Sequence, residues 1–193
     1  MIKKQILIFA VILCGATSAF AQATKPAETD YKDFVIKQVA AIHGGNGPFA
    51  VAGYRMGARA LEELKLLKGS FEVDVTHESL PEVGWTCIAD GIQSSTGASV
   101  GKMNLRVAPV KESKAVRSIV THKQTGTKIT FRLTDSFLEK YGKIPYAELD
   151  QAGRTVMDLK DEEIFGIEIV KGANEKSSPF EQRKNAATKK PKK

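Results

Sequence analysis

The chain has 193 residues, 42% of them hydrophobic, which is enough for one domain with a buried core. Its formal net charge of +7 lies at the two ends: Lys3 and Lys4 contribute +2, and residues 172–193, with seven basic and two acidic side chains, contribute +5. Residues 22–171 are therefore neutral overall. No aromatic residues separate the basic ones at 183–193, which argues against a nucleic-acid partner.

The N-terminus has the three parts of a secretory signal. Two lysines precede an apolar run over 6–14, and Ala-Phe-Ala at 19–21 fits the small-x-small rule for signal peptidase. The apolar run is too short to span a bilayer. This pattern predicts a cleaved signal peptide over 1–21 and a mature protein that is periplasmic or secreted.

Cleavage would also remove Cys14 and leave Cys87 as the single cysteine. A lone thiol in an oxidising compartment cannot form an internal disulfide. We therefore expect Cys87 to be buried, bound to a ligand or paired with another chain.

Residues 172–193 are polar and basic, and this composition predicts a disordered tail. Two interpretations stay open: a solvated chain end, which we favour, or contact with an anionic surface. The expected organisation is a signal peptide over 1–21, one domain over 22–171 and a basic tail over 172–193.

Apolar residues recur at helical spacing in the first part of the mature chain. Over 30–42 they predict a helix whose inner face holds Phe34, Val35, Gln38, Val39 and Ile42. Pro48 fits the first position of a second helix, which runs to about Leu67 and ends at Gly69. Its buried stripe is expected to hold Phe49, Ala52, Gly53, Met56, Ala60 and Leu64.

Alternation of apolar and polar residues then predicts strands. The first covers 71–77, and the second covers 102–107 with Met103, Leu105 and Val107 facing inward.

The remaining elements complete the fold class. Segments 116–122 and 128–133 flank a turn-forming sequence and predict a hairpin, and 163–170 predicts a final strand. Short helices are expected after Asp135 and after Pro145. We predict a single α+β domain with N-terminal helices packed on a mostly antiparallel sheet.

The loop between the first two helices, "HGGNGPF", contains one histidine and three glycines. It has two interpretations: a tight turn that needs positive φ angles, or a cradle of backbone amides at a helix N-terminus for a carboxylate or phosphate. Its spacing matches neither a Walker loop nor a Rossmann fingerprint.

Two stretches, "GYRMGARALEEL" after this loop and "CIADGIQSSTGASVGKMNL" from Cys87, resemble the FmdE family, named for a component of formylmethanofuran dehydrogenase. The family motifs are His-Gly-His-x-Cys-Pro-Gly before a Gly-Tyr/Phe-Arg helix, and Cys-x-x-Asp-Ala-Ile-Gln-x-x-Thr-Gly closing with Gly-Lys-Gly-Asn-Leu. The likeness extends from Phe34 to Leu105, and more loosely through "MDLKDEEIFGIEIV".

The resemblance implies an α+β core, usually dimeric, with an active or metal site in these two motifs. The matching residues are His43, Cys87, Asp90, Gln93, Thr96, Gly97, Lys102 and Asn104. The chain departs from the family at Gly45 (a His in the motif), at Gly47 (a Cys) and at Ala98 (often a Cys), and it lacks the Cys-rich zinc ribbon of many members.

We therefore predict a reduced, open site that binds a small molecule or a metal ion. The predicted ligand-binding residues are His43, Gly45, Asn46, Gly47, Gln93, Thr96, Lys102 and Asn104. The predicted donors to a divalent transition metal, zinc or nickel, are His43, Cys87 and Asp90, although a stable zinc site generally needs three or four protein donors.

Several of these residues also have ordinary structural interpretations. Cys87 could be a small buried hydrophobe and Asp90 a helix cap. His77 is a further metal donor in principle, but its alternation with core residues favours a buried, hydrogen-bonded histidine.

Three functions compete. The first, which we favour, is an extracytoplasmic FmdE-like binding protein for a metal ion or for a metal-bearing or anionic small molecule. The second is a thiol-dependent enzyme with Cys87 as nucleophile and His43 as base. The third is a structural or accessory subunit that has lost the ancestral metal site. A homodimer is expected from the resemblance.

Overall fold

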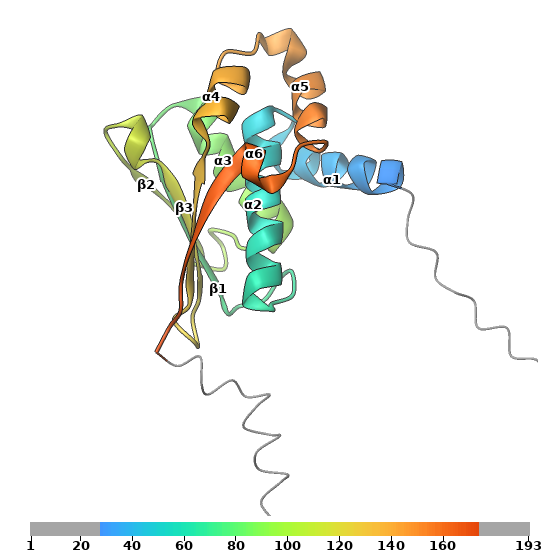
Figure 1. Ribbon diagram of the computed structural model, residues 1–193. Helices are drawn as coiled ribbons and strands as arrows, with labels where there is room; N and C mark the ends of the chain where they lie inside the picture. Colours follow the sequence, from blue (N-terminus) through green and yellow to red (C-terminus); the bar gives the residue numbers. More distant parts are fainter. Residues whose placement is uncertain (1–27, 174–193) are drawn as a thin grey trace, which may run out of the picture.

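The computed structural model describes residues 28–173 of the chain (Figure 1). The predicted signal peptide, and the predicted tail beyond residue 173, lie outside these residues. Within the described part, no helix is both long and apolar enough to cross a membrane.

Helices and strands alternate irregularly along the chain (Figure 1). The helices are α1 (Glu28–His43), α2 (Pro48–Leu64), α3 (Val83–Thr96), α4 (Asp135–Tyr141), α5 (Leu149–Val156) and α6 (Asp161–Ile164), with 3-10 turns η1 (Ser113–Ala115) and η2 (Tyr146–Glu148). The strands are β1 (Val73–Ser79), β2 (Leu105–Pro109), β3 (Arg117–His122), β4 (Lys128–Leu133) and β5 (Phe165–Val170).

The five strands form one sheet in the order β2-β1-β3-β4-β5. The β1–β3, β3–β4 and β4–β5 pairs are antiparallel, which confirms the predicted α+β fold with a mostly antiparallel sheet. The β1–β2 pair is parallel, with Val75 opposite Leu105. A parallel pair needs a crossover connection, and α3 supplies it.

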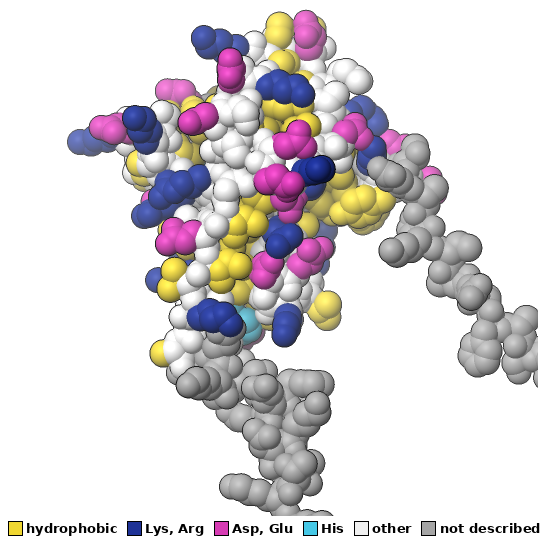
Figure 2. Space-filling view, in the orientation of Figure 1, with side chains coloured by type: hydrophobic (Ala, Val, Ile, Leu, Met, Phe, Trp, Pro, Cys, Tyr) yellow, Lys and Arg dark blue, Asp and Glu magenta, His cyan; other side chains and the backbone are white. Residues whose placement is uncertain are grey.

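The helices cover one face of the sheet (Figure 1). On this face β1 buries Val73, Val75 and His77, in the alternation that the sequence predicts. The other face is polar: the guanidinium of Arg106 donates to both carboxylate oxygens of Asp74, at 2.7 and 2.8 Å. Acidic and basic side chains are interspersed on the surface in view in Figure 2, in line with the neutral balance of residues 22–171.

Helices α2 and α3 cross with their backbones in near contact. A Cβ on Gly53 would lie 2.1 Å from the Ile88 carbonyl oxygen, and a Cβ on Gly91 would lie 1.9 Å from that of Ala50. No side chain fits at either position, so the two glycines set the distance between the helices. The α2 stripe predicted from the sequence is buried as expected, except that Phe49 is half-buried.

The inner face of α1 differs from the prediction. Val35 and Val39 are buried as expected, but Phe34 and Ile42 are 53% and 47% exposed, and Ile36 is buried in their place. Only one narrow stripe of α1 packs against the rest of the protein, so the apolar residues on either side of this stripe are exposed to solvent.

The strand predicted over 102–107 begins later, at Leu105. Met103 lies in a turn with φ of 55° and is 86% exposed, and Val107 is 49% exposed on an edge strand. Leu105 is buried as predicted. Alternation misplaced this start because a polar residue, Asn104, takes the buried position in the turn.

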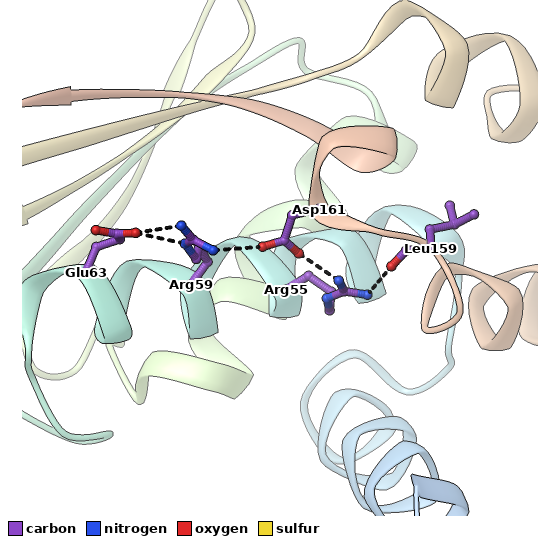
Figure 3. Close-up of polar contacts among 5 residues, drawn as sticks. All are labelled: Arg55, Arg59, Glu63, Leu159 and Asp161. Atoms are coloured by element: carbon purple, nitrogen blue, oxygen red, sulfur yellow. Dashed lines mark hydrogen bonds and ion pairs between the residues drawn. The ribbon is translucent and has the colours of Figure 1, made fainter.

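An arginine of α2 holds the C-terminal segment against the helices. Arg55 donates to the carbonyl oxygen of Leu159 and to the carboxylate of Asp161, at 3.1 and 2.7 Å (Figure 3). It also donates to the carbonyl oxygen of Val156, at 3.2 Å. Its neighbour Arg59 bonds to Glu63 of the same helix and also makes an ion pair of 3.6 Å with Asp161 (Figure 3).

We expect Arg55→Met to lower the free energy of unfolding by about 2 kcal/mol or more, because two carbonyls and a half-buried carboxylate lose their donor. Arg154→Met is the matched control, because it breaks an exposed ion pair with Asp33, and it should cost less than about 0.5 kcal/mol. Urea unfolding followed by circular dichroism measures both, and equal losses would contradict the assigned role.

Candidate functional site

The three predicted metal donors lie on two helices that pack together. His43 is the last residue of α1, and Cys87 and Asp90 lie one turn apart on α3. Asp90 is in the middle of α3, whose N-cap position is Glu82, so it is not a helix cap.

A hydrogen bond joins the two helices at this point. His43 Nδ1 and Asp90 Oδ2 are 2.8 Å apart, with the two side chains 20% and 44% exposed. In the neutral imidazole, donation from Nδ1–H to the carboxylate fixes the tautomer and leaves the lone pair on Nε2. Carboxylates orient metal-binding histidines in this way in metalloproteins, without ligating the ion themselves.

Cys87 is half-buried beside this pair. Burial raises the pKa of its thiol, and the negative charge of Asp90 raises that pKa further. The thiol donates a hydrogen bond to the Val83 carbonyl. These contacts favour the protonated thiol, whereas a nucleophilic cysteine needs a lowered pKa.

The predicted metal donors do not form a complete coordination site. Among residues 28–173, no three His, Cys, Asp or Glu side chains are grouped so that they could hold a metal ion. His77 does not complete it, because its Nδ1 lies 2.9 Å from the Ser118 hydroxyl and its Nε2 lies 3.0 Å from the Trp85 carbonyl. The donors present do not fit a tetrahedral zinc site built by the protein alone.

The glycine loop is closed by the protein's own carboxylate. Asp150, on α5, accepts a hydrogen bond of 2.8 Å from the Asn46 amide, and a Cβ on Gly45 would lie 3.5 Å from the same oxygen. Gly47 precedes α2 without binding a side chain as a cap. Asp150 therefore binds the loop amide that the sequence analysis assigned to an anionic ligand.

The side chain of Asn46 is a separate case. Its Oδ1 is buried and has no hydrogen-bond partner within the described part of the chain. Nearly all buried acceptors have a hydrogen-bond partner, so the lack of one makes this oxygen, three residues after His43, an exception.

Three predicted ligand-binding residues instead stabilise the turn after α3. Thr96 is buried and bonds the Ile92 carbonyl and the Ala98 amide, and Asn104 is buried between the Ser99 amide and the Val73 carbonyl. Lys102 donates to the carbonyls of Gly69 and Gly97. Both Lys102 and Asn104 lie in the turn before β2 rather than in the strand predicted over 102–107. Gln93 lines a small cavity between α1 and the end of α3.

Asp150 is the residue that the sequence did not indicate. It lies 104 positions from Asn46 in a helix with no motif. One local signal was present at Gly153, where a Cβ would lie 1.5 Å from the Asn46 carbonyl, since a glycine inside a helix often marks close backbone contact.

The architecture is that of an α+β domain with a histidine–carboxylate pair between its first and third helices. The family model described as "FmdE, Molybdenum formylmethanofuran dehydrogenase operon" matches residues 42–166, more than half of the chain. The chain belongs to the FmdE family. This confirms the resemblance drawn from the two motifs, and the family's description refers to a molybdenum enzyme.

A solved structure is also similar. A tungsten formylmethanofuran dehydrogenase FmdE-like protein from Syntrophus aciditrophicus is 19% identical, with 72% of each chain covered and a TM-score of 0.49. No curated protein matches the chain.

Burial lowers the pKa of His77 below its ordinary value of 6.5. The unfolded chain therefore takes up a proton near this pH that the folded protein does not, and the free energy of unfolding should fall as pH drops below about 6.5. His77→Gln should flatten this dependence between about pH 6.5 and 5, in denaturant titrations at several pH values. The same slope in His77→Gln and in the unmodified protein would contradict the assignment.

Cys87 should react slowly with iodoacetamide at neutral pH in the folded protein, because its raised pKa limits the thiolate. Asp90→Asn removes the charge that raises this pKa, so alkylation should accelerate roughly twofold to tenfold, as followed by mass spectrometry. Glu139→Gln, which removes an exposed carboxylate on α4, should leave the rate unchanged. Fast alkylation of the unmodified protein would instead favour the thiol-enzyme hypothesis.

Proposed function

We propose that this FmdE-family protein is an exported binding protein for a metal-bearing small molecule, with the Nε2 atom of His43 as its ligand to the metal. The observation that carries the proposal is the 2.8 Å hydrogen bond between His43 Nδ1 and Asp90. A histidine held at one nitrogen presents the other in a fixed direction, which is what a metal ligand requires.

A metal complex is a better candidate than a bare ion. With fewer than three grouped donors among residues 28–173, a bare zinc or nickel ion would keep most of its ligands from water. A complex brings its own donors and needs one open position for an imidazole. The unpartnered Oδ1 of Asn46 would accept a hydrogen bond from such a molecule.

A purely anionic small molecule is the weaker candidate. Asp150 uses the glycine loop, and Asp90 places a negative charge beside His43. The two carboxylates would repel an anion, whereas they would attract a complex with net positive charge.

One observation opposes the thiol-enzyme hypothesis, and another favours the accessory-subunit hypothesis. The raised pKa of Cys87 opposes a thiolate nucleophile. An accessory subunit that has lost its metal site is the second candidate, and the absence of a three-donor group among the described residues favours it.

Export and self-association belong to the same proposal. Export is supported by the signal pattern over residues 1–21. A homodimer is supported by β5, an edge strand on which Ile167 and Ile169 are 37% and 45% exposed, since a second copy would cover them. Light scattering of the mature protein should give twice the mass of the chain, and a monomer would contradict the dimer.

The binding proposal is tested by titrating tag-free mature protein with Ni²⁺–diethylenetriamine, a chelate of net charge +2 with open coordination positions, in a calorimeter. His43→Ala should abolish binding, and Asp90→Asn should weaken it about tenfold or more, because a neutral amide holds the imidazole less strongly than a carboxylate does. His122→Gln is the control and should bind as the unmodified protein does.

Equal binding by His43→Ala would overturn the proposal. Tight binding of free Zn²⁺ by the protein would overturn the preference for a metal complex over a bare ion. Absence of any chelate binding would favour the accessory-subunit hypothesis.

A further inference from the structure

A cavity of about 190 Å³ lies between α1, the turn after α2 and the C-terminal end of α3. It is distinct from the His43–Asp90 pair, although Gln93 lies one turn beyond Asp90 on α3. Its lining is formed by Gln38, Ala41, Ile42, Lys68, Gln93, Ser94 and the segment 97–99.

Ser94 is an unsatisfied polar group in this cavity. The residue is 3% exposed, and its hydroxyl has no hydrogen-bond partner within the described part of the chain. The neighbouring hydroxyls of Ser95 and Thr96 both bond to carbonyls of α3. A buried hydroxyl without a partner costs free energy, so a ligand that supplies the partner gains that energy.

The charge of the lining identifies the kind of partner. Lys68 is the single charged side chain among the lining residues, and none of them is acidic. Its Nζ donates to Gln38 Oε1 at 3.1 Å, across the exposed side of the cavity. The side-chain amide of Gln93 makes no hydrogen bond within the described residues. One ammonium, one hydroxyl and one amide together are donors for a carboxylate.

The rest of the lining is apolar and limits the ligand's size. Ala41, Ile42 and Ala98 supply methyl and methylene surface. The volume suits a molecule with a few carbon atoms rather than a nucleotide or a peptide, which need pockets of several hundred Å³.

We propose that this cavity binds a small aliphatic monocarboxylic acid, with its carboxylate accepting hydrogen bonds from Lys68, Ser94 and Gln93 and its hydrocarbon chain against Ile42. Entry requires Lys68 to exchange Gln38 for the carboxylate. This exchange costs little, because the existing bond is exposed and joins a charge to a neutral amide. The site uses neither His43 nor Cys87, so it stands independently of the metal-ligand proposal.

The test is a titration of the folded mature protein with butyrate, with butyramide and butylamine as matched neutral and cationic probes, followed by amide chemical shifts. Butyrate should shift resonances of α1 and the end of α3, and the two other probes should bind at least tenfold more weakly, because each fails to pair with the Lys68 charge.

Two variants test the residues. Lys68→Met and Ser94→Ala should each weaken butyrate binding about fivefold or more. Ser94→Ala should fold at least as stably as the unmodified protein, since it removes a buried hydroxyl that has no partner, so its loss of binding cannot be attributed to unfolding. Lys37→Met, at an exposed position of α1, is the control and should bind normally.

The proposal is overturned if butyrate causes no shifts near the cavity, if butyramide binds as well as butyrate, or if both variants bind as tightly as the Lys37→Met control.

Discussion

The near contact of α2 and α3 at Gly53 and Gly91 determines where the polar groups that α3 contributes to the candidate site lie. Because the two backbones touch, the contact fixes the position of α3 along α2 and its rotation about its own axis. Cys87, Asp90 and Gln93 lie at successive turns of α3. A side chain at either glycine would push α3 outward, and Asp90 would then no longer reach His43 at the end of α1. The geometry of the site thus depends on two residues that take no part in its chemistry.

The protein satisfies with its own groups most of the positions that resemble ligand sites. Asp150 closes the glycine loop, Lys102 and Asn104 stabilise the turn before β2, and His77 has partners at both nitrogens. Two groups remain unsatisfied among the buried side chains near the first and third helices: the Asn46 oxygen and the Ser94 hydroxyl. The two proposals rest on this contrast, because an unpartnered buried group is where an external molecule gains most.

Family membership and site chemistry are separate conclusions here. The α2 and α3 motifs are retained where they build the fold, as in Gly53, Arg55 and Thr96, and Arg55 anchors the C-terminal segment (Figure 3). Among the positions that differ from the family motif, Gly45 and Gly47 stand where that motif has a histidine and a cysteine. Family membership therefore identifies the fold, and function has to be argued from the residues of this chain.

The sequence by itself determined the α+β class, the buried stripe of α2, the strand β1 and the family, because these depend on local periodicity and on contiguous motifs. It also brought His43 and Asp90 into one predicted site. The tertiary structure decided which polar groups have hydrogen-bond partners and which residues are buried. Asp150 bonds the loop from 104 positions away, and the Ser94 hydroxyl lacks a partner. Asn104 is buried rather than Met103. Occupancy of a hydrogen-bonding group depends on chain segments far apart in sequence, and no local pattern encodes which of them meet.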